Sequence, residues 1–157
     1  MHDETLLIET TADDSAAVTL FAEQEAELMR RYGGDDTGPR PAPGSPTLLL
    51  RVEGEVVGCV ALALDDGAGV AEIKRMYVAA RARGRGLSRL LLAGVERLAA
   101  RRGVELLRLV TGVEQPEAIA LYSSAGYELV PGFGYWVDEP TARFFVKRLA
   151  PEVADEA

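Results

Sequence analysis

The sequence predicts a single domain of mixed α/β (α+β) class, in which a mostly antiparallel central sheet carries helices on both faces. The chain has 157 residues, which suits one sizeable hydrophobic core and leaves little for a second. Apolar residues make up 48% of the chain and charged residues 27%, as in ordinary globular proteins. Apolar residues also recur at strand and helix spacing in the order β-α-β-β-β-α-β-α-β. We therefore expect one domain over residues 1–157, with a core of about residues 5–149.

The first predicted strand covers residues 5–9 and leads into a helix. Residues 13–15, two aspartates and a serine, offer side chains that cap the N-terminus of this helix, which is expected to end near residues 32–34. Residues 33–46 then hold too many glycines and prolines for regular structure. They predict a long, mobile surface loop, and such loops often carry binding functions.

Three further strands are predicted at residues 47–52, 55–64 and 70–78, and short turns join them into an antiparallel meander. The next apolar residues recur at helical spacing and predict a long helix: Leu87, Leu90, Leu91, Val95 and Leu98. An Arg-Arg-Gly sequence at residues 101–103 supplies a basic last turn and a stop for this helix.

A strand, a short helix and a final strand complete the predicted fold. The first of these strands covers residues 105–111. Pro116 stands at the first position of the short helix, which runs through Ser124 and stops before Gly126. The final strand covers residues 142–149.

Composition and charge argue against several classes of function. A formal net charge of −8 disfavours a nucleic-acid partner. No apolar run approaches the roughly 20 residues that cross a bilayer, and the N-terminus lacks the basic flank of a secretion signal. We therefore expect a cytoplasmic protein with no membrane partner. Cys59 and His2 are the only soft ligands and stand far apart, so we expect no metal site and no internal disulfide. The apolar neighbours of Cys59 predict a core residue rather than a nucleophile.

The strand that ends at Val78 runs into a turn rich in arginine and glycine at the start of the long helix: Arg81-Ala82-Arg83-Gly84-Arg85-Gly86-Leu87-Ser88. Free backbone N–H groups, the helix dipole and glycines that admit a close approach make such a helix start a pyrophosphate site. Arg83, Arg85 and Arg89 add positive charge. The alternative is an arginine-rich surface turn that caps a core helix.

Two familiar nucleotide-binding motifs do not fit this turn. A nucleoside-triphosphate loop would place Lys-Ser or Lys-Thr after the glycines, and neither pair is present. The three-glycine dinucleotide fingerprint belongs in a parallel βαβ unit rather than after an antiparallel meander.

The turn resembles the acetyl-CoA signature Q/R-x-x-G-x-G/A of the GNAT family of N-acetyltransferases. The pattern is read from Arg83 to Ser88, with Ser88 in place of the last glycine or alanine. The resemblance implies the GNAT acyl-CoA N-acyltransferase fold, acetyl-CoA as cosubstrate, and cofactor binding by the strand end and the turn: Met76, Tyr77, Val78, Arg83, Gly84, Arg85, Gly86, Leu87 and Ser88. Backbone N–H groups near Tyr77 or Val78 are candidates to polarise the thioester carbonyl.

A second stretch, residues 111–127, resembles the family pattern asparagine-x-x-alanine-x-x-x-tyrosine followed by glycine-phenylalanine. Gln115 stands at the asparagine and Tyr127 at the phenylalanine. The resemblance places Gln115 at the cofactor and Tyr122 beside the cofactor sulfur. A phenol with an ordinary pKa of about 10 stays protonated at neutral pH and can donate a proton to the leaving thiolate. The alternative for Tyr122 is a packed aromatic side chain on an apolar helix face.

The attacking amine must lose a proton, and Glu72 is the candidate general base. Its surroundings resemble the stretch that supplies the base in the histone acetyltransferase branch of the family. Strand alternation places Glu72, Lys74, Met76 and Val78 on one face. An equally weighted alternative is a glutamate at the rim of the site, paired with Lys74 or Arg75.

These features predict direct transfer of an acetyl group from acetyl-CoA to a primary amine, without a metal and without a covalent enzyme intermediate. We expect a small-molecule acceptor, because the short chain shows no added peptide-binding module. The alternatives are a protein N-terminal or lysine acetyltransferase and a non-catalytic acyl-CoA-binding regulatory domain. A homodimer is left open.

The acceptor side is expected to form from the segments that the cofactor signature leaves unassigned. These are the loop over residues 33–46 and the segment of residues 133–136, which holds three aromatic side chains. Asp35 and Asp36 would draw a cationic amine. A solvated loop with ordinary surface packing is the plainer alternative for both segments.

Overall fold

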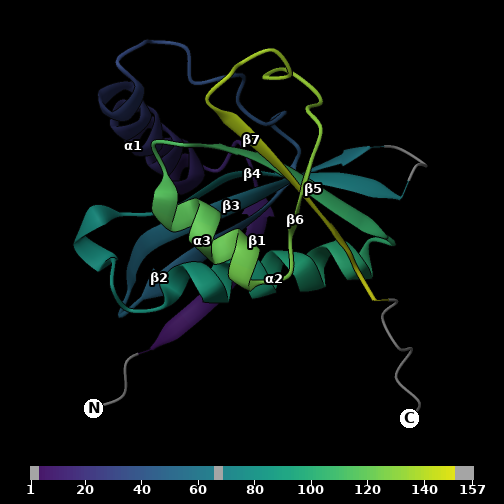
Figure 1. Cartoon of the computed structure of the whole chain (residues 1–157). Helices are drawn as coiled ribbons and strands as arrows, with labels where there is room; N and C mark the ends of the chain where they lie inside the picture. The colour runs from purple at the N-terminus through teal and green to yellow at the C-terminus, as the bar shows by residue number, and fades with distance from the viewer. Residues whose placement is uncertain (1–3, 66–68, 151–157) are drawn as a thin grey trace.

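The computed structural model describes residues 4–65 and 69–150. In chain order its elements are β1 (Thr5–Thr11), α1 (Ser15–Tyr32), β2 (Pro46–Val52), β3 (Glu55–Asp65), β4 (Val70–Val78), η1 (Ala80–Ala82), α2 (Leu87–Arg101), β5 (Leu106–Gly112), α3 (Pro116–Ser124), β6 (Glu128–Val130) and β7 (Ala142–Arg148). The strands form one seven-stranded sheet in the order β1-β2-β3-β4-β5-β7-β6 (Figure 1). β4 and β5 pair in parallel, whereas every other neighbouring pair is antiparallel. The mixed, mostly antiparallel sheet is thus confirmed.

Every predicted helix and strand is present, and β6 and the short 3-10 helix η1 are additions. β6 has 3 residues and pairs with β7, so it is too short to show an alternating pattern in the sequence. Residues 34–45 are free of helix and strand, which confirms the irregular loop. Residues 66–68 of the predicted turn, like His2, lie outside the described residues.

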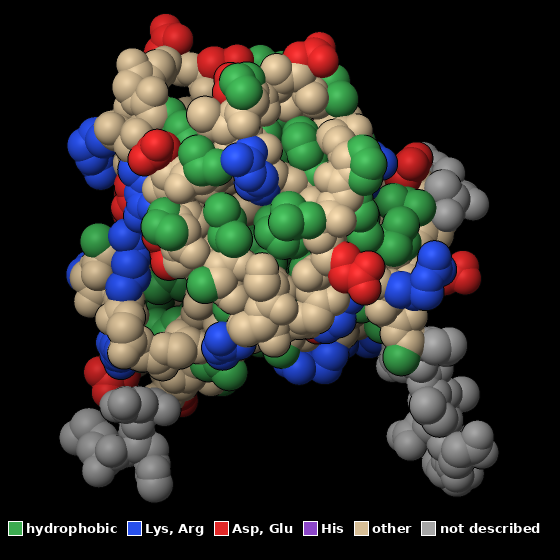
Figure 2. Space-filling model, viewed as in Figure 1, with side chains coloured by type: hydrophobic (Ala, Val, Ile, Leu, Met, Phe, Trp, Pro, Cys, Tyr) green, Lys and Arg blue, Asp and Glu red, His purple; other side chains and the backbone are tan. Residues whose placement is uncertain are grey.

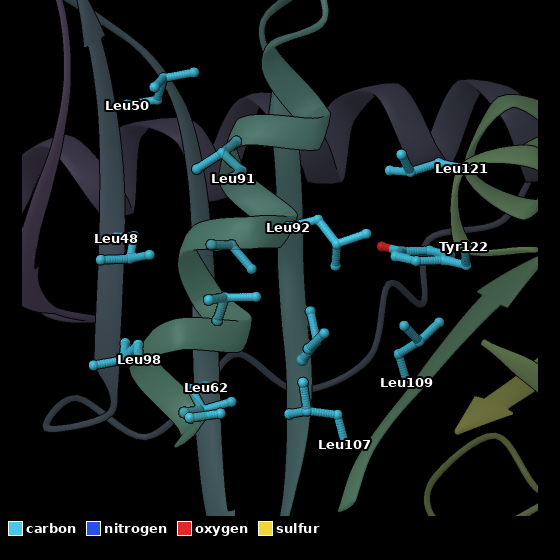
Figure 3. Close-up of a cluster of buried hydrophobic side chains, with 14 of the residues drawn as sticks. Leu48, Leu50, Leu62, Leu91, Leu92, Leu98, Leu107, Leu109, Leu121 and Tyr122 are labelled. Atoms are coloured by element: carbon cyan, nitrogen blue, oxygen red, sulfur yellow. The ribbon is translucent and has the colours of Figure 1, made fainter. Parts of the chain in front are cut away.

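The two faces of the sheet carry different helices (Figure 1). α2 packs its apolar side on one face and forms the larger buried cluster with the central strands (Figure 3), which includes Leu62, Leu91, Val95, Leu98 and Leu107. α1 packs on the other face, where a second cluster includes Leu20, Phe21, Leu49, Cys59 and Tyr77. Helices on both faces are therefore confirmed. Within the described ranges, no helix combines the length and the apolar character needed to span a bilayer.

The face shown in Figure 2 carries hydrophobic side chains spread among acidic and basic ones. This view looks onto α2, α3, β6 and β7 (Figure 1). Among the exposed large hydrophobic side chains of these elements are Leu90 of α2 and Leu129 of β6. The homodimer stays a prediction.

Asp14 caps the N-terminus of α1. Its Oδ1 accepts a hydrogen bond from the Ala16 N–H at 2.8 Å, and its Oδ2 accepts one from the Thr10 hydroxyl at 2.9 Å. At the other end of the helix Gly33 adopts a φ of 76°, and its N–H donates to the Met29 carbonyl. Both ends of α1 are therefore fixed by local hydrogen bonds, and this helix supplies one wall of the site described below.

We expect Asp14→Ala to lower the free energy of unfolding by about 1–2 kcal/mol, because the first turn of α1 loses an N-cap acceptor. Asp13→Ala is the matched control. Among the described residues, the Asp13 carboxylate accepts a hydrogen bond only from the exposed Thr11 hydroxyl, so the loss should stay below about 0.5 kcal/mol. Urea denaturation of both variants measures the difference. Equal losses would show that the Asp14 cap does not stabilise the helix.

Candidate active site

The site begins where the two parallel strands of the sheet part. The register of β4 and β5 runs from Val70 opposite Leu106 to Glu72 opposite Arg108 and stops there. Both strands continue beyond this point, β4 to Val78 and β5 to Gly112. The far halves of the two strands therefore leave a gap in the middle of the sheet, and side chains from both strands line it.

A β-bulge in β4 lies beside this gap. Against β3, Tyr77 stands opposite Cys59 but Lys74 stands opposite Ala61, so two residues of β4 face the single residue Val60. One of the two, Arg75, adopts a backbone φ of 56°, which residues other than glycine rarely adopt. The bulge therefore reverses which face the following residues occupy.

This reversal corrects the expectation that Glu72, Lys74, Met76 and Val78 share one face. Met76 and Val78 pack in the cluster under α2, whereas Tyr77 packs in the cluster under α1. Glu72 lies between Ala71 and Ile73, which both belong to the α2 cluster, so Glu72 faces the α1 side. An inserted residue shifts the strand period by one, and the sequence carries no sign of the insertion.

Two adjoining hollows follow the gap. The first, which we call the turn hollow, has a volume of about 330 Å³ and lies between the end of β4, the turn before α2, and α3. The second, the loop hollow, has a volume of about 530 Å³ and is lined by residues 34–39, Glu72, Tyr135 and Trp136. Several residues line both hollows, and we call the region that they share the junction: Gln24, Leu28, Ile73, Arg75, Val110, Thr111 and Gln115. The predicted cofactor and acceptor segments thus meet in one cleft.

The turn before α2 has the backbone of an anion site. Gly84 and Gly86 have φ values of 80° and 74°, and Gly86 is the N-cap residue of α2. No side chain of the described residues caps this helix start, and its first turn has no acidic residue. A helix of 15 residues therefore presents unpaired N–H groups and its positive dipole end to the turn hollow.

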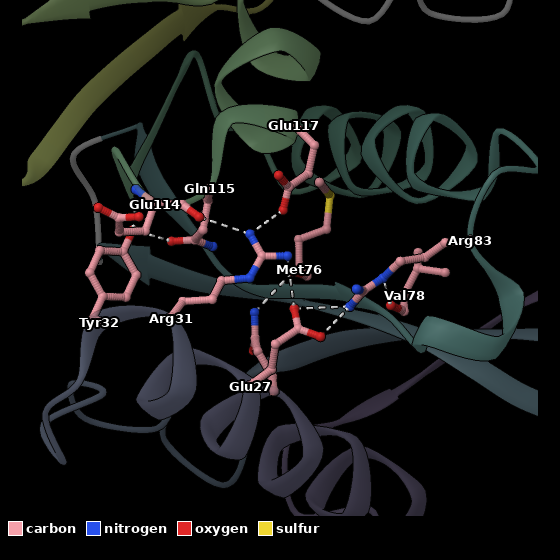
Figure 4. Close-up of polar contacts among 10 residues, drawn as sticks. Glu27, Arg31, Tyr32, Met76, Val78, Arg83, Glu114, Gln115 and Glu117 are labelled. Atoms are coloured by element: carbon pink, nitrogen blue, oxygen red, sulfur yellow. Dashed lines mark hydrogen bonds and ion pairs between the residues drawn. The ribbon is translucent and has the colours of Figure 1, made fainter.

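The arginines near the turn differ in their contacts. The Arg83 guanidinium donates to the Val78 carbonyl at 2.9 Å and pairs with Glu27 at 2.8 Å, so its charge is already neutralised (Figure 4). Arg89 donates to the Ser124 hydroxyl at 2.9 Å. Arg85 is exposed and makes no ion pair or hydrogen bond with the described part of the chain. The charge of Arg85 is therefore free to pair with an anion, whereas Arg83 lines the turn hollow but is already paired.

An ionic chain connects α1 to α3 across the gap (Figure 4). Arg31 pairs with Glu27 at 3.3 Å and also with Glu117 at the start of α3, and it donates to the Glu114 carbonyl at 2.9 Å. Gln115 accepts a hydrogen bond from the Tyr32 hydroxyl at 3.0 Å. These contacts hold the C-terminal end of α1 against the β5–α3 connection, so α1 closes one side of the cleft.

Tyr122 lies on α3 and lines the turn hollow. Only 6% of its surface is exposed, and it lies among the buried side chains of the α2 cluster (Figure 3). Its ring packs edge-on against Tyr127 at a centroid distance of 5.6 Å. Its hydroxyl has no hydrogen-bond partner among residues 4–65 and 69–150. Burial raises the pKa of the phenol well above its ordinary value, so Tyr122 holds its proton at neutral pH. The packing alternative is therefore observed for Tyr122, and its role as proton donor stays a prediction.

Glu72 lines the loop hollow but not the turn hollow. Its carboxylate pairs with Lys74 at 3.6 Å and with Arg108 of β5 at 3.4 Å. The alternative of a rim glutamate paired with Lys74 is thus observed. The pairing with Arg75 is not observed, because Arg75 pairs with Glu25. Glu72 stays a proposal for the general base.

No pattern in the sequence predicted the role of Arg75. Its guanidinium pairs with Glu25 at 2.8 Å and donates to the Gly38 carbonyl at 3.0 Å, and its side chain is 6% exposed. Burial lowers the pKa of this arginine, whereas the hydrogen bonds from Arg40 lower the pKa of Glu25. Trp136 lies against Gly38 from the other side. Arg75 thus anchors the loop over residues 33–46 to the bulge. We expected a mobile loop, and that expectation did not include this anchoring contact.

Cys59 is fully buried, which confirms the core prediction. Its thiol contacts the Arg75 carbonyl at 3.4 Å, and burial raises its pKa to about 12. A thiol with so high a pKa has almost no thiolate at neutral pH and is a poor nucleophile. Within the described residues, no group of three potential ligands is arranged for a metal ion, and the absence of a metal stays a prediction.

Comparison with known proteins identifies the family. The model of the Acetyltransferase (GNAT) family matches residues 7–127. The chain belongs to the GNAT acetyltransferase family. A relative from Azospirillum brasilense named IAA acetyltransferase is 35% identical over 154 residues, which cover 95% of this chain and 100% of the relative.

Solved GNAT structures agree with this fold. A protein from Klebsiella pneumoniae described as an acyl-CoA N-acyltransferase is 31% identical with a TM-score of 0.80, and the match covers 93% of this chain and 98% of that one. A GNAT acetyltransferase from Elizabethkingia anophelis with acetyl-CoA bound has a TM-score of 0.70 at 19% identity, covering 94% and 100%. At 19% identity, the similarity to this second structure supports the fold alone.

The GNAT signature fits the turn better in a second register, from Arg81 to Gly86. In that register its two small residues are Gly84 and Gly86, and both have the positive φ that favours glycine. In the register from Arg83 to Ser88, the last small residue already lies inside α2. The serine that departed from the pattern is then an ordinary helix residue.

Proposed function

We propose that this GNAT protein moves an acetyl group from acetyl-CoA to the primary amine of a small molecule by direct attack. The observation that carries the proposal is the cleft itself. An uncapped helix start with two positive-φ glycines stands at one end, and a separate, larger hollow opens at the other. The acetyl-CoA bound in the Elizabethkingia anophelis relative supports the choice of cosubstrate.

In this proposal the pyrophosphate of acetyl-CoA binds at the α2 start, where N–H groups of the first turn and Arg85 meet it. The pantetheine arm follows the backbone of Met76, Tyr77 and Val78, beside Gln115, into the gap between the strands. The thioester then lies at the junction, where backbone N–H groups of β4 polarise its carbonyl. The amine enters from the loop hollow.

The transfer forms a C–N bond and breaks the C–S bond. The electron pair of the C–S bond leaves on sulfur, and Tyr122 donates its proton to that thiolate. The nitrogen gives up a proton to Glu72, which lies on the wall of the loop hollow rather than at the junction. We therefore assign Glu72 a path through water.

Two observations support a small acceptor. A volume of about 530 Å³ falls in the range of small-molecule sites, and aromatic side chains from residues 135 and 136 line it. The name of the Azospirillum brasilense relative also supports a small-molecule acceptor. The cytoplasmic location stays a prediction.

A panel of primary amines and lysine-containing peptides, assayed for thiol release from acetyl-CoA and for product mass, tests the proposal. We expect thiol release that depends on a small amine, with one acetyl group added to it. Release with peptides alone would favour the protein acetyltransferase. Acetyl-CoA binding without release for any acceptor would favour the regulatory domain.

We expect Asp35→Asn to lower kcat/KM for a cationic amine by about 2- to 5-fold at low salt, and less at high salt, because exposed charges steer ligands over a screened range. Asp35 is exposed on the wall of the loop hollow. Asp36 is less suited, because its carboxylate accepts from the Tyr135 hydroxyl at 2.8 Å and from the Gly38 N–H at 2.9 Å. Asp65→Asn, exposed and outside both hollows, is the control. The same loss for an amine that carries no charge at the assay pH would reject steering.

A further inference from the structure

We propose that Gln24 of α1 positions the attacking amine, by accepting a hydrogen bond from its nitrogen at the junction, with the Thr111 hydroxyl of β5 as a second partner. This inference rests on the proposed function. It assigns a role to Gln24, which lies outside both stretches that resemble the family patterns, and to Thr111, the first residue of the second stretch.

The first observation is the place of these residues. Gln24 comes from α1 and Thr111 from β5, and both line the turn hollow as well as the loop hollow. The thioester arrives from the turn hollow and the amine from the loop hollow, so the new C–N bond must form where the hollows meet. Glu72 and Tyr122 each line only one of the two hollows.

The second observation is that both side chains carry a buried polar atom without a partner. Gln24 is 8% exposed and Thr111 is 9% exposed, and neither Gln24 Oε1 nor Thr111 Oγ1 has a hydrogen bond within the described chain. Buried polar atoms in native proteins almost always have partners, and each exception calls for an explanation such as a catalytic role, a bound water or ion, or stored strain. A ligand that enters the junction and displaces the residues around it would bring a hydrogen-bond donor to these two oxygens.

The orientation of the Gln24 amide is fixed by its neighbour. Its Nε2 donates to the Met76 carbonyl at 3.0 Å, in the segment just after the bulge. The opposite orientation would place two carbonyl oxygens against each other, so the hydrogen bond identifies which atom is nitrogen. The free Oε1 is therefore an acceptor only, and it suits an N–H donor.

A free acceptor at the junction suits a nitrogen that becomes positive. During attack the lone pair of the amine points at the thioester carbon, so its N–H bonds point away and need acceptors. As positive charge develops on nitrogen, a hydrogen bond to an amide oxygen strengthens, which favours the transition state over the bound substrate. Arg75 is the cation that also lines both hollows, and Glu25 holds it at 2.8 Å. Gln24 cannot take the proton, so it is a positioning residue and not the base.

The test uses Gln24→Met, which keeps the length and removes the acceptor. We expect kcat/KM for the amine to fall by about 10- to 100-fold, because a misplaced nucleophile loses attack geometry. The dissociation constant for CoA should stay within about twofold, since the role concerns the amine. Thr111→Val should lower kcat/KM by about 3- to 10-fold and provides the test if Gln24→Met does not fold. Thr47→Val is the control, because Thr47 is fully buried, lies outside both hollows and donates to the Ser45 carbonyl.

Three outcomes would overturn the inference, and each leads to a different conclusion. Unchanged kcat/KM in Gln24→Met and Thr111→Val would remove both residues from amine positioning. A parallel loss of CoA affinity would show that the free oxygen serves an amide of the pantetheine arm instead. A wild-type protein without amine-dependent thiol release would overturn the proposed function, and the role of Gln24 with it.

Discussion

Gly86→Asp should weaken CoA binding by about 100-fold or more, because a negative charge some 5 Å from the pyrophosphate costs several kcal/mol at an effective dielectric of about 20. Two features of the residue make the effect large. Gly86 is the N-cap of α2 with a φ of 74°, so a side chain there also strains the turn. Calorimetric titration of CoA into the variant measures the loss.

Gly103→Asp separates the charge effect from the backbone effect. Gly103 lies just beyond the opposite end of the same helix, with a φ of 78° and, like Gly86, open space around a built Cβ. The two variants therefore share the new charge and nearly the same backbone strain. We expect CoA affinity within about twofold of wild type for Gly103→Asp. Equal affinities in the two variants would place the phosphate site elsewhere.

Tyr122→Phe should lower kcat by about 10²-fold or more while leaving the dissociation constant for CoA unchanged, because proton donation to the thiolate is lost. The change should hardly affect stability. The Tyr122 hydroxyl has no hydrogen-bond partner within the described residues, and the ring contacts with Tyr127 and Phe145 persist in phenylalanine. Burial raises the pKa of Tyr122, so this group should not reduce kcat between neutral and moderately alkaline pH.

Tyr127→Phe provides the opposite pattern. The Tyr127 hydroxyl donates to Glu96 at 2.8 Å, and Glu96 also pairs with Lys147 at 3.1 Å. Removal of the hydroxyl should lower the free energy of unfolding by about 1–2 kcal/mol and leave kcat within about twofold of wild type. If Tyr122→Phe loses stability but keeps kcat, the side chain is a packing residue and another group protonates the thiolate.

Local sequence patterns predicted the fold well because each element carries its own signals. The apolar repeat of α2, its basic last turn and Gly103 all agree on one helix, and Pro116 marks the start of α3. β6 shows the limit of this reasoning. Its 3 residues become a strand only because β7 lies beside them, and that pairing is a tertiary contact.

The candidate site was predictable where backbone and short motifs define it, and not where distant segments meet. The glycine turn and Tyr122 carry recognisable patterns. The bulge at Arg75 does not, and it reversed the predicted faces of Met76 and Val78. Gln24 belongs to no motif in the sequence, and its burial beside Met76 depends on the packing of α1 against β4.

A crystal structure of the protein with acetyl-CoA tests the central claim most directly. We expect the pyrophosphate to lie against the N–H groups at Gly84, Gly86 and the first turn of α2. The pantetheine arm should lie between β4 and β5, and the thioester should lie at the junction beside Gln24 and Thr111. A pyrophosphate bound away from the α2 start, or an acetyl group that does not reach the junction, would contradict it.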